Sequence, residues 1–411
     1  MKFPTVFSNS YGMAVKQLRQ MLFEKTAVEG LFCFENRKEI FEGVDSRFKF
    51  VVLTFEKGGR TTDFPAAFMR HDVSELNAFP NAYSLRIPLT LVQRISPDSL
   101  SVPEFKTQID IGVADKLLKF PFLNDGDKGW GLEIYGEELH MNRASHLFKN
   151  TPTKTPLYEG GMIWQFDHQY ERPQYWISEK EIRASFLEKR VKRTEGLKTA
   201  PKDMRNDYET FRLAFRKIAS NTNERTLIVA IIPPGSVTGN SLSVHFPFYH
   251  DKDRYDQTRF TDAELLLLTA LLNSFVVDFS LRAKMTTNLN TFFLYQLSIP
   301  RLPVSHAAFV PIVKRAAQLI CNGPEFDVLI KQVSTALKLP ASAVKGVKDS
   351  SARIQLRAEL DALIAQLYGL SESEFAHILT TFPLVDESVK QQTLNTYRDL
   401  LCLGKLPDTR T

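Results

Sequence analysis

The sequence has few cysteines and no apolar run long enough to cross a membrane. Its 411 residues include only Cys33, Cys321 and Cys402, which lie far apart. An odd, scattered set predicts neither a disulfide framework nor a zinc knuckle, so we expect a reducing, cytoplasmic location. The most apolar stretch, residues 265–277, is interrupted by Asn273 and is too short for a membrane span. It therefore indicates a core helix.

The motifs of several enzyme classes are also missing. The sequence has no P-loop, GxGxxG, GxSxG, HExxH or CxxC pattern, and no apolar signal segment follows Met1. His140 and His146 are six residues apart, which is not the spacing of one helical face. Asp110 and Asp115 lack the further acidic and lysine positions of a nuclease site. The sequence therefore favours neither a metal site nor nucleophilic catalysis.

The composition is that of a globular protein with a basic balance. Hydrophobic residues make up 43% and charged residues 24%, and the formal net charge is +5. This length suits two or three domains, and the charge suits a polyanionic partner. The 31 phenylalanines predict large buried aromatic faces and could leave a few rings exposed for stacking on bases.

Apolar spacing predicts strands and helices in the first part of the chain and helices in the last part. The predicted strands cover residues 28–34, 47–55, 63–69, 227–232 and 241–248. The predicted helices cover residues 11–25, 104–119, 263–284, 306–321, 325–338, 351–368, 371–379 and 386–401. Thr261 and Asp262 are expected to cap the third of these helices.

Residues 211–235, FRLAFRKIASNTNERTLIVAIIPPG, follow the most basic part of the chain, residues 179–217. Their first part is compatible with a helix that carries Arg212 and Arg216. A junction rich in amide side chains follows, and then comes the predicted strand 227–232. The junction could be a helix cap and turn, since Ser, Asn and Thr are ordinary capping residues. It could also hold a nucleic-acid base edge or phosphate.

A second candidate is Phe41, within the IFEG segment of the loop between the first two predicted strands. Enzymes that act on a DNA base flip the base out of the helix and stack it against an aromatic ring. A ring in this loop could reach a pocket at the sheet edge, although core packing is the ordinary fate of a phenylalanine.

Six segments carry a resemblance to a known family. They are FENRKEIFEGVDSRFKFVVLTFEKG (34–58), AAFMRHDVSEL (66–76), LYEGGMIWQFDHQY (157–170), FRLAFRKIASNTNERTLIVAIIPPG (211–235), LLNSFVVDFSLRAKMTTNLNTFFLYQLSIPR (271–301) and FPLVDESVK (382–390). In this order they resemble the C-terminal half of adenine-N6 DNA methyltransferases of the type IIG restriction–modification kind, and of related phage-defence methylases.

The resemblance implies a fold class, a partner and site residues. The fold would be an α/β hairpin remnant of a methyltransferase sheet (1–60), an α+β target-recognition domain (61–303) and a helical C-terminal region (304–411). Phe41 would stack on the flipped adenine, and double-stranded DNA would be the partner. We expect DNA contacts from basic and amide side chains, because Arg pairs with guanine, Asn pairs with adenine, and Lys and Arg bind phosphate. The candidates are Arg212, Arg216, Asn221, Asn223, Arg225, Lys284 and Asn288.

Two motifs of that family are missing. The Gly-containing loop that binds S-adenosylmethionine and the Asn/Asp-Pro-Pro-aromatic motif do not occur, and Pro233-Pro234-Gly235 lacks the flanking residues of the latter. We therefore expect no catalytic residue in this chain, and S-adenosylmethionine to bind the complete enzyme but not this chain alone. A hairpin over residues 27–57 would also leave an unpaired apolar sheet edge, which soluble proteins avoid. This predicts a fragment or a split subunit that pairs with an upstream polypeptide.

Three functions stay open at this point. The chain could be a DNA-binding specificity module that acts by itself. It could form an adenine methyltransferase together with a polypeptide that carries the catalytic half. It could also be an inactive remnant of such an enzyme.

Overall fold

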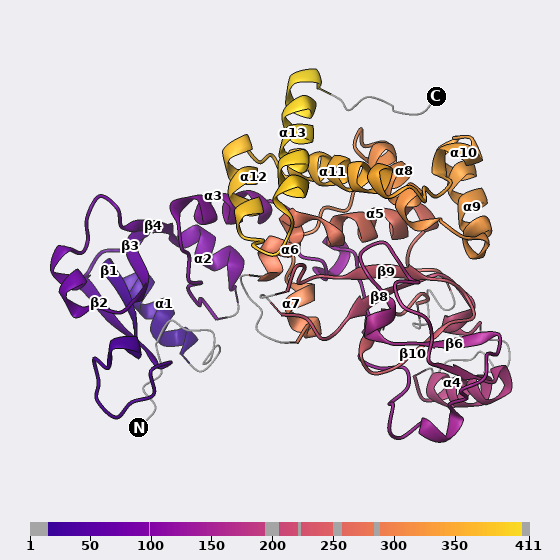
Figure 1. The fold of residues 1–411 in the computed structure, drawn as a ribbon. Helices are drawn as coiled ribbons and strands as arrows, with labels where there is room; N and C mark the ends of the chain where they lie inside the picture. Colours follow the sequence, from indigo (N-terminus) through magenta and orange to yellow (C-terminus); the bar gives the residue numbers. More distant parts are fainter. Residues whose placement is uncertain are drawn as a thin grey trace. The chain divides into compact units, whose positions relative to one another are not determined.

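The computed structural model describes residues 15–97, 99–193, 205–220, 223–249, 257–282 and 288–404. The chain divides into two compact units, unit 1 (Met1–Lys119) and unit 2 (Phe120–Thr411). Figure 1 follows the chain through the elements of each unit. Asn221 and Lys284, two of the predicted DNA contacts, lie outside the described residues.

Unit 1 contains a four-stranded sheet in the order β2-β1-β3-β4. Its elements are α1 (Lys16–Lys25), β1 (Thr26–Glu35), β2 (Lys49–Lys57), β3 (Asp63–Arg70), β4 (Leu85–Pro88), α2 (Leu89–Ile95) and α3 (Gln108–Leu117). Strand β1 is central and buried on both faces. Leu31 and Cys33 pack in one apolar cluster, and Phe32 and Phe34 pack in another. This division follows from the alternation of side chains along a strand.

The predicted strands and the helix before Lys119 are confirmed, and α1 matches the described part of the helix predicted over residues 11–25. The unpaired edge predicted for the hairpin does not lie at β1, because β3 pairs with β1 in parallel through Leu31 and Ala66. Among the described residues, the edge without a partner strand is that of β2. Since β3 and β4 continue the sheet of the hairpin, the first compact unit extends to Lys119, beyond the predicted boundary at residue 60.

Unit 2 contains two small sheets, in the orders β5-β11-β8-β9 and β10-β6-β7. The strands are β5 (Ile134–Tyr135), β6 (Thr155–Tyr158), β7 (Tyr175–Ile177), β8 (Arg212–Arg216), β9 (Val229–Ile232), β10 (Val237–Thr238) and β11 (Leu242–His245). Helix α4 (Glu179–Arg193) follows β7. The predicted strands over residues 227–232 and 241–248 are confirmed as β9 and β11.

The predicted helix that carries Arg212 and Arg216 is wrong, because these residues form β8. Strand β8 lies between β11 and β9, and its first four residues are buried. The alternation of Phe211, Leu213 and Phe215 with other residues is the strand signal at this position.

Helices complete unit 2. They are α5 (Asp262–Asn273), α6 (Phe275–Arg282), α7 (Thr291–Tyr295), α8 (Phe309–Ile320), α9 (Asp327–Leu337), α10 (Ala341–Val344), α11 (Ser350–Leu367), α12 (Glu372–Thr380) and α13 (Glu387–Leu403). Thr261 and Glu264 form a capping box at the start of α5, which confirms the predicted start. The single helix predicted over residues 263–284 is interrupted at Ser274, so that α5 and α6 meet at 57°.

The helices predicted after residue 305 are confirmed, and they belong to the same compact unit as the two small sheets. Among the described helices, none is by itself long and apolar enough to cross a membrane. Of these helices, only α5 and α6 together, a pair bent at Ser274, have sufficient length and apolar composition. Nearly all residues of α5 are buried inside unit 2.

Candidate nucleic-acid interface

Phe41 lies in the loop that connects β1 and β2. It is 52% exposed, and its ring meets the ring of Phe50 edge to face at a centroid distance of 4.7 Å. The Phe50 ring in turn stacks on Phe34 of β1 at 5.0 Å. Phe41 is therefore the outermost ring of an aromatic cluster that begins in the sheet, and half of it faces solvent.

The side chain of Asn36 fixes this loop. Asn36 is fully buried, and its Nδ2 donates to the carbonyl oxygens of Phe41 (3.0 Å) and Val44 (2.8 Å). Its Oδ1 accepts from the N–H of Phe41 at 2.8 Å. One amide side chain thus bonds to three backbone groups of the turn; the carbonyl oxygen of Phe41 also accepts from the N–H of Val44 at 3.3 Å. Asn36 was not among the predicted site residues, although an Asn at a strand end is an ordinary turn signal.

The charges around the Phe41 loop are balanced. Lys38 pairs with Asp72 at 3.0 Å, and Arg47 pairs with Asp45 at 2.7 Å. The buried Glu35 carboxylate accepts a hydrogen bond from Arg37 and lies within hydrogen-bond distance of His71. Burial opposes the ionisation of Glu35, but these two hydrogen bonds lower its pKa below the ordinary value. The feature that the loop offers to a ligand is therefore the apolar ring of Phe41, because its basic side chains are paired with acids.

Arg212, a predicted DNA contact, is buried in the interior of unit 2. It is 0% exposed, pairs with the equally buried Glu138, and donates to the carbonyl oxygen of Ser236 at 2.6 Å. Glu138 also accepts from the N–H and the hydroxyl of Thr238, both at 2.9 Å. Arg212 could reach DNA only by leaving a buried carboxylate unpaired, so its role is structural.

Arg225, another predicted DNA contact, is also buried. It is 5% exposed; its Nε is 2.8 Å from Oδ2 of Asp278 in α6, and it donates to the carbonyl oxygen of Asn273 at 2.7 Å. Asp278 additionally accepts from the N–H groups of Thr226 and Leu227. This network attaches the segment before β9 to α6, and it corrects the expectation that Arg225 reads a base.

Arg216 lies at the end of β8, next to an aromatic pair formed by the half-buried Trp164 and the exposed Tyr170. Its guanidinium is 5.2 Å from the ring of Trp164 and donates to the carbonyl oxygen of Ile163. Trp164 stacks on Tyr170 at 5.5 Å, and Tyr170 is 56% exposed. Burial lowers the pKa of Arg216, but an arginine keeps its charge in proteins. The result is a cation–π stack with a solvent-facing ring.

The chain beyond Arg216 pairs with the segment that contains Asn288. Ile218 and Asn288 form an antiparallel bridge, and the N–H of Leu289 donates to the carbonyl oxygen of Lys217 at 2.9 Å. Asn288 and Asn223 are exposed, and Arg282 of α6 donates to the carbonyl oxygen of Asn223. The structure therefore places the exposed candidates Asn223 and Asn288 near the end of β8. It places Arg212 and Arg225 in the interior of unit 2.

In the part of the chain that the structure describes, no group of three His, Cys, Asp or Glu side chains could hold a metal ion.

Comparisons with known proteins give distant similarities. No protein-family model matches the sequence, and no curated protein matches it. Among solved structures, the chain is similar to the type IIL restriction-modification enzyme MmeI in complex with DNA, with a TM-score of 0.34 and 12% identity over 87% of this chain and 46% of that one. It is also similar to the type IIG restriction endonuclease BpuSI, with a TM-score of 0.32 and 12% identity over 88% of this chain and 46% of that one. The chain thus spans less than half the length of either enzyme, and similarity at this level assigns no function.

Proposed function

We propose that this chain is the DNA-recognition part of a site-specific adenine-N6 DNA methyltransferase of a restriction–modification or phage-defence system. The observation that carries the proposal is the conformation of the loop between β1 and β2 in unit 1. The segment IFEG resembles the adenine-stacking loop of these methyltransferases, and its Phe41 is half exposed on a loop that Asn36 holds through three hydrogen bonds.

In this proposal Phe41 stacks on a flipped adenine. Stacking of one base on an aromatic side chain contributes about 1–3 kcal/mol. Phe50 supports the ring from one edge, and the buried amide of Asn36 fixes the backbone that carries it. A loop that is already ordered loses little conformational entropy on binding, so more of the stacking energy appears as affinity.

Unit 2 would contact the DNA duplex through the exposed residues near the end of β8. Tyr170 and Asn288 offer a ring and an amide to solvent, and the guanidinium of Arg216 lies against Trp164, on which Tyr170 stacks. Asn side chains can pair with the major-groove edge of adenine, and a tyrosine hydroxyl can bind a phosphate oxygen.

The cofactor and the catalytic half would come from a partner polypeptide. The sequence lacks the motifs for S-adenosylmethionine and for the adenine amino group. Among the described residues, the outer edge of β2 pairs with no strand, and it carries the half-buried Val51 and Leu53 and the 47% exposed Phe55. We expect no transfer of labelled methyl groups to DNA by this chain alone and transfer once the partner is added. Transfer by the isolated chain would contradict this part of the proposal.

A comparison of two phenylalanine variants tests the stacking role. The substrates are two duplexes, one with adenine opposite an abasic site, where flipping costs least, and one fully paired. We expect the full chain to prefer the first duplex in fluorescence anisotropy. Phe41→Ala should lose roughly 5- to 150-fold of this preference, as expected from the loss of about 1–3 kcal/mol for one stacked base. Phe55→Ala removes an equally exposed ring of the same unit and should retain the preference. Equal behaviour of the two variants would refute the role of Phe41.

A further inference from the structure

A small cavity lies in unit 2, and its lining includes neither Tyr170 nor Asn288, the two side chains of this unit proposed to contact DNA. Its volume is ≈ 130 Å³, and α5, α6, α11 and α13 contribute to its wall. A protein cavity of about 150 Å³ can hold one benzene molecule. This cavity therefore has room for a ligand of about five or six non-hydrogen atoms.

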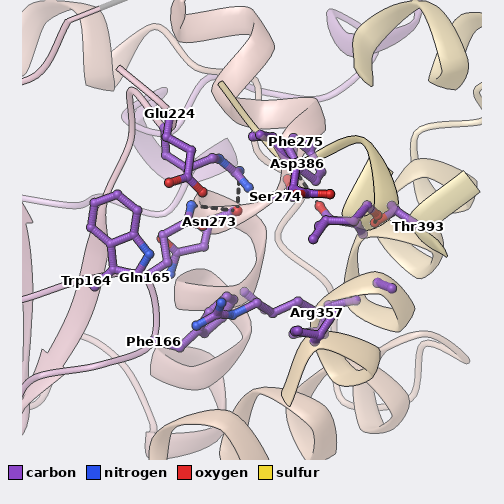
Figure 2. A pocket seen from close by; sticks show the side chains of 18 residues that line it. Trp164, Gln165, Phe166, Glu224, Asn273, Ser274, Phe275, Arg357, Asp386 and Thr393 are labelled. Atoms are coloured by element: carbon purple, nitrogen blue, oxygen red, sulfur yellow. Dashed lines mark hydrogen bonds between the residues drawn. The ribbon is translucent and has the colours of Figure 1, made fainter. Parts of the chain in front are cut away.

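Two oppositely charged side chains of α11 line the cavity without pairing to each other. Arg357 extends from α11 into the cavity (Figure 2). In the described part of the chain, the buried Nε of Arg357 has no hydrogen-bond partner, and no ion pair joins Arg357 to an acid. Asp361 follows one turn later on the same helix; one of its oxygens accepts from the N–H of Phe275 at 2.7 Å. Each charge therefore lacks an opposite charge in contact with it.

The other buried charge at the cavity is compensated. Arg225 also lines it, but its guanidinium is paired with Asp278. Burial lowers the pKa of Arg357 to about 10 and raises the pKa of Asp361 to about 6, so both groups are ionised at neutral pH. Glu224 and Asp386 contribute further, exposed carboxylates to the lining. The cavity thus offers one site for an anionic group and several for a cationic one.

We propose that this cavity binds a small zwitterion of the amino-acid class, with the ligand carboxylate on Arg357 and the ligand ammonium on Asp361. An arginine fork matches the two oxygens of a carboxylate, and an ammonium group donates three hydrogen bonds. Glycine, with five heavy atoms, and β-alanine, with six, have the required size. The carboxylates of Asp361, Glu224 and Asp386 disfavour a free phosphate or a DNA phosphate at this place.

Isothermal titration calorimetry of the full chain with glycine and β-alanine tests the proposal, and acetate and methylammonium serve as single-charge comparisons. We expect saturable binding of at least one zwitterion, and weaker binding of acetate and methylammonium. Arg357→Gln and Asp361→Asn should each weaken binding roughly 10- to 100-fold, as expected when a charge-assisted hydrogen bond is lost. Lys348→Gln removes an exposed positive charge just before α11 and should bind like the wild type.

Both cavity variants are expected to fold. Arg357 has no described protein partner to lose, and an Asn at position 361 still accepts from the N–H of Phe275. Circular dichroism checks this before each titration. Absence of saturable binding of both zwitterions to the wild type would overturn the proposal. Equal binding of acetate, or unchanged binding in folded Arg357→Gln and Asp361→Asn, would overturn it as well.

Discussion

Substitution of Asn36 by Ala tests whether one buried amide controls the loop that presents Phe41. The change removes three hydrogen bonds to the backbone of Phe41 and Val44. At about 0.5–1.5 kcal/mol for each net hydrogen bond, the loss sums to roughly 1.5–4.5 kcal/mol. Because water can reach part of the opened loop, we expect a loss of about 2–3 kcal/mol in the stability of unit 1. A domain of ordinary stability would remain folded.

Native-state hydrogen exchange is the direct assay, because the N–H of Phe41 is itself bonded to Asn36. Its protection should fall roughly 30- to 150-fold in Asn36→Ala, in line with a change of about 2–3 kcal/mol. The matched control is Asn81→Ala in the same unit. Asn81 makes comparable turn contacts to Ala78 and Tyr83, but at an exposed site. If Asn36→Ala changes the exchange of the Phe41 N–H no more than Asn81→Ala does, the account of the loop is wrong.

Three further predictions concern unit 2 and its DNA contacts. Arg212→Ala leaves the buried Glu138 carboxylate without its ion-pair partner and should lower the free energy of unfolding, measured in urea, by about 3–5 kcal/mol. A change below about 1 kcal/mol, as for an exposed ion pair, would contradict the structural role of Arg212. Burial raises the pKa of Asp361 from 3.8 to about 6, so the native state holds a proton in this range that the unfolded chain releases. As the pH rises from about 4 to about 6, the melting temperature of the wild type should therefore fall relative to that of Asp361→Asn. Melting temperatures that change with pH in parallel for the two proteins would refute this. Tyr170→Ala removes one proposed hydrogen bond to phosphate and should weaken duplex binding by about 1 kcal/mol in anisotropy titrations, whereas Tyr83→Ala, which removes an exposed ring of unit 1, should leave it unchanged.

The elements with a strong apolar period could be predicted from the sequence. Helix α5 follows a capping box of Thr261 and Glu264, and β9 is a short apolar run that ends at two prolines. Signals of this kind depend only on residues that are close together in the sequence. The parallel pairing of β1 with β3 is different, because the partner strand lies beyond the whole of β2. No local pattern shows that pairing, and without it β1 was expected to have an unpaired edge.

The candidate DNA contacts show the same limit. Arg212 and Arg225 have the residue type and the sequence position of base-reading side chains, but both are buried. Their acidic partners are 74 and 53 residues away, so only the tertiary fold pairs them. The exposure of Phe41 depends on how the loop folds against the strand that follows it, since its ring rests on Phe50 of that strand. Asn36, in contrast, is a residue type that local turn chemistry could have indicated.

Selection from a pool of randomised DNA duplexes tests the central claim most directly. The full chain, at low and then at physiological salt, is incubated with the pool, and the bound fraction is sequenced. Recognition predicts enrichment of one short sequence that contains adenine, with an affinity that falls linearly with salt on logarithmic axes. Phe41→Ala should enrich the same sequence with lower affinity. Binding without any enriched sequence, or no binding at low salt, would contradict the claim that this chain recognises DNA sequence.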